Sequence, residues 1–198
     1  MAMYPVFLKL KDKECLVVGG GKVALRKVHG LLAAGARVTV IAPRLETALR
    51  DMTGTGKIAS NERPYRSEDL TSCAVVIAAT DSAQVNHRIF RDAQNARILA
   101  NVVDDPEHCD FYVPSIVKRG DLQVAISTSG KAPLFAKRLR KFLERILYPG
   151  LDEDLGTLGE ERKRAIQSSC KTGEARHEDV RRALAARIAE IMRRIEQA

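Results

Sequence analysis

The sequence lacks the features that mark membrane, secreted and disulfide-rich proteins. No apolar run approaches the roughly 20 residues that span a bilayer, and no basic segment followed by a long apolar stretch opens the chain. The four cysteines are far apart and form no C-x-x-C pair, which excludes a disulfide framework and a zinc knuckle. These absences predict a soluble, cytoplasmic, globular protein without a transmembrane helix.

Positive charge is concentrated in one part of the chain, and aromatic residues are scarce. Residues 113–145 contain eight Lys and Arg against two Asp and Glu, a net +6 within a total of +8. Such a basic field concentrates an anionic partner, and charge alone does not separate nucleic acid, membrane and polyanionic small molecule. No helix-turn-helix signature accompanies it, and only 5% of residues are aromatic. A nucleic-acid contact is therefore not expected.

The first half of the chain alternates buried-strand runs with helical patterns. Strands are predicted at residues 14–19, 37–43, 57–60, 74–81 and 98–103, and helices at 22–34, 45–52 and 82–95. Continuous apolar runs are typical of strands that are buried on both faces. Alternation with crossover helices predicts an α/β fold with a doubly wound, Rossmann-type parallel sheet.

After residue 106 the pattern changes. Residues 111–117 and 122–127 resemble two antiparallel strands around a turn, and Pro133 begins a helix to Leu147 with a basic outer face. The remainder is polar and helical. We therefore predict three parts: a Rossmann domain at 1–112, a small α+β dimerisation and substrate-binding region at 113–148, and a helical C-terminal appendage at 149–198.

The segment directly after the first predicted strand fits G-x-G-x-x-A, with Gly19, Gly21 and Ala24 at the three defining positions. Gly19 permits a tight turn, Gly21 lets a pyrophosphate approach the backbone, and Ala24 allows the helix to pack closely on the sheet. The helix N-terminus then faces the phosphates. This context predicts a dinucleotide site.

The acid that usually binds the adenine ribose near the end of the second strand is missing, because Ala42, Pro43 and Arg44 stand there. Arg44 suits either the 2′-phosphate of NADP or the flank of the adenosine of NAD, so the residues alone leave both open. Thr80 and Asp81 follow another strand and are expected to face the cofactor. Asn101 and Asn86 are weaker candidates.

No Tyr-x-x-x-Lys pair is present, which excludes a short-chain dehydrogenase mechanism. Asp104 ends the last predicted parallel strand, at the edge where catalytic groups collect, and is a candidate general base. An ordinary Asp-Asp-Pro turn is the alternative. His108, Cys109 and Asp110 follow closely, but no metal site is predicted, and His87 is expected to have a solvated or packing role.

The segment from Ser127 to Pro133 offers hydroxyls, backbone N–H groups and Lys131 to a carboxylate, although helix capping explains it almost as well.

Together these residues resemble the precorrin-2 dehydrogenase family, which includes the N-terminal module of siroheme synthase. The shared segments, in family order, are YPVFLKL from Tyr4, CLVVGGGKVA from Cys15, AATD from Ala78, NVVDDP from Asn101, FYVPSI from Phe111 and ISTSGKAP from Ile126. They cover about residues 3–147. No methyltransferase-like segment follows, so the chain resembles the stand-alone form.

The resemblance implies NAD-dependent oxidation of precorrin-2, a heavily carboxylated tetrapyrrole, to sirohydrochlorin, with Asp104 as the catalytic residue. It implies that Lys22, Val23, Pro43 and Arg44 contact NAD, and that the chain forms a homodimer through the region after the Rossmann domain. The acetate and propionate arms of the substrate would pair with the basic block. The residues proposed for the substrate are Ser127, Thr128, Lys131, Lys137 and Arg138, with Lys118 and Arg119 as further basic candidates.

Two questions stay open at this point. Some family members also use the catalytic aspartate to insert iron, so Fe²⁺ or Co²⁺ insertion is neither predicted nor excluded. Thr128 stands where the siroheme synthase module has a serine, which puts any serine-dependent regulation in doubt. The alternative from another class is an NAD-sensing Rossmann module that performs no chemistry.

Overall fold

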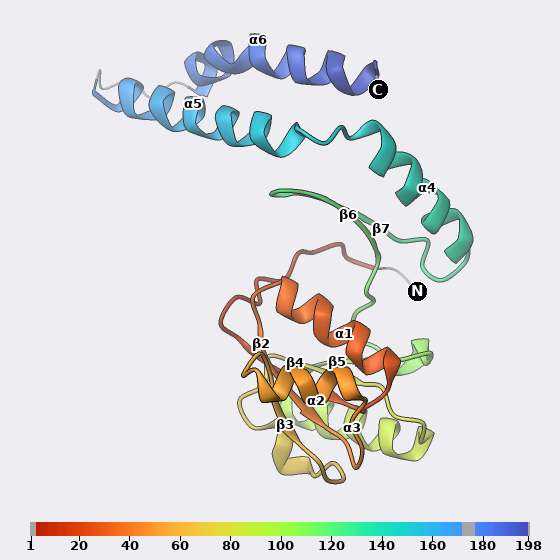
Figure 1. Cartoon of the computed structure of the whole chain (residues 1–198). Coiled ribbons are helices and arrows are strands. Elements are labelled where there is room, and N and C mark those ends of the chain that lie inside the picture. The colour runs from red at the N-terminus through yellow and green to blue at the C-terminus, as the bar shows by residue number, and fades with distance from the viewer. Residues whose placement is uncertain (1–2, 172–176, 198) are drawn as a thin grey trace. The chain divides into compact units, whose positions relative to one another are not determined.

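The computed structural model describes residues 3–171 and 177–197 (Figure 1). Residues 172–176, which the sequence places in the helical tail, lie outside the described residues. The chain divides into two compact units, one of residues Tyr4–Tyr112 and one that contains Val113–Ala198.

The first unit is built on a five-stranded parallel sheet in the order β3-β2-β1-β4-β5. Its strands are β1 (Glu14–Val18), β2 (Arg37–Ile41), β3 (Ala59–Asn61), β4 (Val75–Ala78) and β5 (Leu99–Val102). In the central register Val17 lies between Val40 of β2 and Ile77 of β4. The strand order reverses between β1 and β4, and ligands of such sheets bind outside the carboxyl ends of the strands at that point.

Helices cover both faces of this sheet (Figure 1). Val17 packs in one core with side chains of α1 (Lys22–Ala33) and α2 (Thr47–Gly54). Its neighbour Leu16 packs in the other core, with α3 (Ala83–Ala96) and the 3₁₀ helix η1 (Ser67–Leu70). Because successive strand residues point to opposite faces, unbroken apolar runs are what a sheet covered on both sides requires. The predicted α/β, Rossmann-type fold class is confirmed.

The second unit begins with an antiparallel hairpin of β6 (Ser115–Arg119) and β7 (Leu122–Ile126). Three helices follow, α4 (Pro133–Ile146), α5 (Leu151–Lys171) and α6 (His177–Glu196). One core joins Val117 of the hairpin, Leu147, Leu151 of α5 and Ile191 of α6. The boundary predicted near residue 148 therefore does not separate two cores.

Two details of this region differ from the sequence prediction. The strand expected from Phe111 begins only at Ser115, because Pro114 has no N–H to donate and the Phe111 carbonyl accepts a hydrogen bond from Asn101 Nδ2 at 2.9 Å. A short 3₁₀ helix, η2 (Pro106–His108), precedes it. In the described part of the chain, no helix combines the length and hydropathy that a membrane crossing requires.

Candidate dinucleotide-binding site

The turn between β1 and α1 contains three consecutive glycines, two of which the protein itself requires. Gly19 has a φ of +130°, and a Cβ atom there would lie 2.2 Å from the carbonyl oxygen of Ala79. A Cβ atom at Gly20 would lie 1.8 Å from the carbonyl oxygen of Arg44. Both positions need glycine because the turn packs backbone against backbone on the loops that follow β4 and β2.

Gly21 has no such reason to be glycine. Its φ of −95° suits other residues, and a Cβ atom would meet no atom of the described residues within 4 Å. Gly21 is the N-cap of α1, where no side chain caps the helix and the first turn is without acidic residues. The first N–H groups of α1 therefore keep their hydrogen-bonding capacity and the positive end of the helix dipole. Open space beside free N–H groups fits a pyrophosphate.

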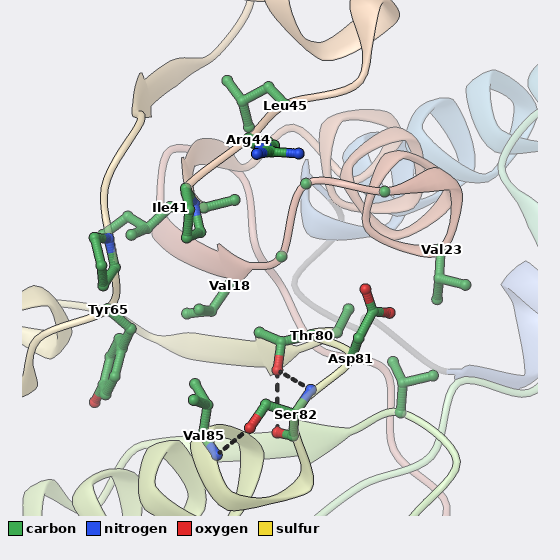
Figure 2. A pocket seen from close by; sticks show the side chains of 18 of the residues that line it. Val18, Val23, Ile41, Arg44, Leu45, Tyr65, Thr80, Asp81, Ser82 and Val85 are labelled. Carbon is green, nitrogen blue, oxygen red and sulfur yellow. Dashed lines mark hydrogen bonds between the residues drawn. The ribbon is translucent and has the colours of Figure 1, made fainter.

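A cavity of about 1050 Å³ opens beside this turn (Figure 2). Residues that follow β1, β2, β4 and β5 line it, so it lies at the carboxyl ends of the strands around the point where their order reverses. Ligand pockets usually measure about 300–1,000 Å³. The cavity is therefore large enough for an extended ligand such as a dinucleotide.

The loop after β2 forms the wall next to the glycine turn and includes Pro43, Arg44 and Glu46. The Glu46 N–H donates to the Gly20 carbonyl at 2.8 Å, which fixes this loop against the turn. Glu46 Oε2 is buried and has no hydrogen-bond partner among the described residues. A buried carboxylate oxygen without a donor is unfavourable, and Glu46 is one of the residues that line the cavity.

The loop after β4 forms the facing wall with Thr80 and Asp81 (Figure 2). Asn86 of α3, only 7% exposed, holds it in place. Asn86 Nδ2 donates to the Thr80 carbonyl at 3.0 Å, and Thr80 Oγ1 donates to Asn86 Oδ1 at 2.7 Å. Asn86 thus acts through Thr80 and does not line the cavity.

Asp104 lines the cavity at the end of β5 with a φ of +60°. Aspartate tolerates this left-handed conformation better than most residues, and such backbone positions concentrate at functional sites. Lys27 of α1 is its charged neighbour. Burial foremost, and then Arg26, lower the pKa of Lys27, whereas Cys109 and Asp104 raise it. Lys27 Nζ donates to Asn101 Oδ1 at 3.3 Å.

The structure brings most of the predicted cofactor residues together. The cavity is lined by Gly19, Gly21, Lys22, Val23, Pro43, Arg44, Thr80, Asp81 and Asp104. Ala24 is fully buried against the sheet, as the third position of the motif requires. Asn101 does not line the cavity, because it lies within β5 and its amide is used inside the fold.

The predicted substrate residues belong to the second unit. Lys131, Lys137 and Arg138 are exposed, in the loop before α4 and on α4 itself. The hydroxyls have local partners: Thr128 Oγ1 accepts from the Ala132 N–H at 3.1 Å, and Ser127 Oγ accepts from the Ser129 N–H at 3.2 Å.

Arg119 was expected to be a further basic candidate for the substrate, but its guanidinium is used within the second unit. It donates to the carbonyl oxygens of Leu147 and Glu144 at 2.9 and 2.6 Å, so it caps the C-terminal end of α4 instead of offering its guanidinium to a substrate.

Sequence reasoning missed several residues of the cavity wall, among them Glu46, Tyr65 and Arg88. Glu46 left a signal, since it is an acid five residues after the end of β2, close to where a ribose-binding acid is expected. No local sequence pattern marks Tyr65 and Arg88, because their positions depend on contacts between distant segments. The Tyr65 hydroxyl donates to Asp92 at 3.0 Å, and the Arg88 guanidinium lies over the Tyr65 ring.

The parallel sheet, the glycine turn and the cavity at the switch point define a Rossmann-type dinucleotide-binding protein. A family described as "Putative NAD(P)-binding" matches residues 6–115, and one described as "Sirohaem biosynthesis protein central" matches residues 119–146. The chain belongs to the putative NAD(P)-binding family. The sequence resemblance to the N-terminal part of siroheme synthases is thereby confirmed.

Individual relatives agree with this family. The siroheme synthase of Methylobacillus flagellatus is 43% identical over 176 residues, which are 89% of this chain and 38% of the relative. Siroheme synthase 3 of Aeromonas hydrophila is 42% identical over 176 residues, which again are 89% of this chain and 38% of the relative. This chain thus spans little more than a third of their length. A solved structure titled "SirC, precorrin-2 dehydrogenase" matches with a TM-score of 0.72 and 28% identity, covering 99% of this chain and 100% of that one.

Proposed function

We propose that this chain is an NAD-dependent dehydrogenase that oxidises precorrin-2 to sirohydrochlorin. The observation that carries the proposal is that Asp104 and the glycine turn line the same cavity. A nicotinamide bound there supplies the hydride acceptor. The likeness to a protein titled precorrin-2 dehydrogenase over nearly the whole chain supports the substrate.

Asp104 is the residue placed to handle the proton. Oxidation of a carbon–nitrogen or carbon–carbon single bond releases a hydride and a proton, and the proton needs an acceptor near the hydride acceptor. The exposed carboxylate of Asp104 lies at the cavity edge, where substrate and water both have access. Lys27 of α1 lies within electrostatic reach of this carboxylate.

Glu46 favours NAD over NADP. Its carboxylate stands on the wall formed by the loop after β2, where the adenine ribose of a Rossmann cofactor lies. A 2′-phosphate there would meet a negative charge, whereas a 2′-hydroxyl would donate to it. Glu46→Gln removes the charge and is expected to narrow the ratio of kcat/KM for NAD to that for NADP. If this ratio is unchanged from wild type, Glu46 does not determine the preference for NAD, and Arg44 becomes the residue to test.

The basic residues of the second unit are proposed to recognise the carboxylate arms. Lys131, Lys137 and Arg138 are exposed, and none of the three has an ion pair among the described residues. Free ammonium and guanidinium groups form charge-assisted hydrogen bonds with carboxylates. We expect these contacts to determine the KM for the tetrapyrrole.

The partner of this unit is proposed to be a second copy of the chain. Leu134, Phe135 and Phe142 of α4 are 78%, 60% and 47% exposed, and Ile116 of the hairpin is 44% exposed. Large apolar side chains gathered on one element mark an interaction surface. The family resemblance supports a homodimer through this region.

The experiment that tests the function uses anaerobic precorrin-2 with NAD or NADP and follows sirohydrochlorin absorbance together with the reduced cofactor. Equal formation of both products is expected, with NAD preferred. Binding of NAD without turnover of precorrin-2 would favour the alternative of an NAD-sensing module, and absence of both would reject the proposal.

A further inference from the structure

Two imidazoles and one carboxylate converge on a single point beside the last parallel strand. His87 Nε2 lies 3.0 Å from Asp105 Oδ2, and His108 Nδ1 lies 2.8 Å from the same oxygen. The three potential ligand atoms all lie within 4.8 Å of one another. In the part of the chain that the structure describes, this is the only group of three or more such side chains at that spacing.

The topology of the sheet explains why residues 18 positions apart meet. His87 lies in the second turn of α3, which begins at the edge of the sheet where β4 ends. Asp105 is the N-cap of η2 and His108 is its last residue, and η2 follows β5 at the same edge. The cluster lies next to Asp104 in the chain, but none of its members lines the dinucleotide cavity.

Helix capping does not account for Asp105. It is the N-cap residue of η2, where an aspartate usually accepts a backbone N–H, yet its side chain makes no capping hydrogen bond. Both imidazoles contact its Oδ2 instead. The carboxylate thus faces both histidine rings, and the backbone N–H of His108 also interacts with it.

The two rings are held in place by their surroundings. The imidazoles of His87 and His108 stack with centroids 4.2 Å apart and planes 28° apart, and Phe90 packs edge-on against His108 at 5.1 Å. Without a cation, each neutral imidazole can donate its one N–H to Asp105 Oδ2, His87 from Nε2 and His108 from Nδ1. A divalent cation can take the place of both protons, because the lone pairs of the same two nitrogen atoms and the Asp105 carboxylate are then available to it.

We infer that His87, Asp105 and His108 form a binding site for a late first-row divalent metal ion such as Co²⁺, Zn²⁺ or Fe²⁺. Two imidazole nitrogens and one carboxylate oxygen suit these ions, whereas Mg²⁺ and Ca²⁺ prefer oxygen ligands. Ligand atoms of a tetrahedral zinc site at roughly 2.0–2.2 Å from the ion lie about 3.4 Å from one another. The separations here lie between 2.8 Å and 4.8 Å, which brackets that spacing. The remaining positions are open to water or another ligand.

Cys109 is adjacent in sequence but is not part of the ligand set. Its thiol lies 3.1 and 3.2 Å from the carbonyl oxygens of Val102 and Asp105, which accept its hydrogen. The site is therefore expected to bind metal without a thiolate. This inference does not rest on the proposed function.

Titration of the untagged, metal-free protein with Co²⁺ tests the site. We expect one equivalent to bind with the visible ligand-field bands of nitrogen and oxygen ligands and without intense thiolate-to-cobalt charge-transfer bands. Zn²⁺ should displace the Co²⁺, and Mg²⁺ should not. The conservative variants His87→Gln, His108→Gln and Asp105→Asn should each weaken Co²⁺ binding by at least about tenfold.

His29→Gln is the matched control, since His29 is an exposed histidine on α1 and should leave Co²⁺ binding unchanged. Unchanged affinity for NADH in each variant shows that the first unit is folded, because the three ligands do not line the cavity. The inference is overturned if wild type takes up no Co²⁺, if the double variant His87→Gln/His108→Gln binds it as wild type does, or if charge-transfer bands reveal a thiolate site.

Discussion

The three glycines of the β1–α1 turn are adjacent in sequence but have different roles. Gly19 and Gly20 are required by contacts between backbone atoms of the protein, whereas the space over Gly21 is open. Of the three glycines, two are therefore needed by the fold, and the third leaves space for the ligand.

Gly21→Ala tests this division. Its methyl group would occupy the space proposed for the pyrophosphate, so the Kd for NADH should rise at least about tenfold, or roughly 1.4 kcal/mol. The free energy of unfolding should change by less than about 1 kcal/mol, because no described residue is displaced.

Gly30→Ala is the control for that substitution. Gly30 lies inside α1 with no described atom within 4 Å of an added Cβ. Alanine there should stabilise the helix by about 0.5–1 kcal/mol and leave the NADH affinity unchanged. If Gly21→Ala binds NADH as tightly as wild type, the phosphates lie elsewhere.

Asp69 gives a pH-dependent contribution to stability. Two hydrogen bonds from Arg63, at 2.5 and 2.9 Å, lower the pKa of Asp69, and the Arg66 N–H adds a third at 2.7 Å. Because the folded pKa lies below the unfolded value of about 3.9, the stabilisation is full above that pH and is lost as the pH falls through the folded pKa.

Asp69→Asn should therefore lower the free energy of unfolding by about 1–3 kcal/mol at neutral pH, with the gap to wild type closing in acid. Urea unfolding across this pH range measures the gap. Asp51→Asn, at an exposed position on α2, should show no comparable gap. If the difference in free energy of unfolding between wild type and Asp69→Asn stays constant down to the lowest pH, the stabilisation does not depend on ionised Asp69.

Some residues of the site could be predicted from local sequence patterns, and others could not. Asp104 and the glycines were predictable because each belongs to a local pattern at a strand end. The contacts of His87 were not predictable, since its partner Asp105 lies in a different strand–helix connection. Glu46 was missed although it is an acid five residues after the end of β2. Asn101 was expected to face the cofactor, but its side chain accepts a hydrogen bond from Lys27 and donates one to the Phe111 carbonyl. Local sequence does not reveal either partner.

At the scale of elements, the parallel sheet and its helices were the predictable part. Strand β4 is apolar throughout and β1 is apolar after Glu14, and α1 starts at Lys22 as expected. The hairpin boundary was not predictable from alternation, because the Phe111 carbonyl is taken by Asn101 rather than by a neighbouring strand. The shared core of hairpin, α5 and α6 depends on contacts such as Val117 with Leu151, which no local pattern reveals.

Helix α4 carries the charge that we assign to the substrate. The double variant Lys137→Glu/Arg138→Glu should raise the KM for precorrin-2 by at least about tenfold, with kcat and the NADH affinity nearly unchanged, because these charges are proposed to bind the carboxylate arms and not the atoms that react. Added salt should raise the wild-type KM in the same direction.

Arg162→Glu/Arg164→Glu, at exposed positions of α5, alters the net charge equally and serves as the control. An equal rise in KM for both double variants would mean that net charge, and not the α4 surface, governs binding. A fall in kcat alone would place Lys137 or Arg138 in the chemistry instead.

At the scale of the whole molecule, the exposed apolar face of α4 predicts self-association. Sedimentation equilibrium should give a dimer, and Phe135→Asp/Phe142→Asp should give a monomer, since each charge would be buried unpaired in the interface. NADH affinity should persist in the variant, because the cavity is built from the first unit alone. A wild-type monomer, or a dimeric double variant, would reject α4 as the contact.

The proposed dehydrogenation requires Asp104 at the edge of the cavity. The measurement is kcat for NAD-dependent formation of sirohydrochlorin, beside the Kd for NADH, in wild type and Asp104→Asn. We predict a loss of at least about a hundredfold in kcat, as expected when a general base is removed, with a nearly unchanged Kd. A wild-type kcat in Asp104→Asn would exclude Asp104 as the general base.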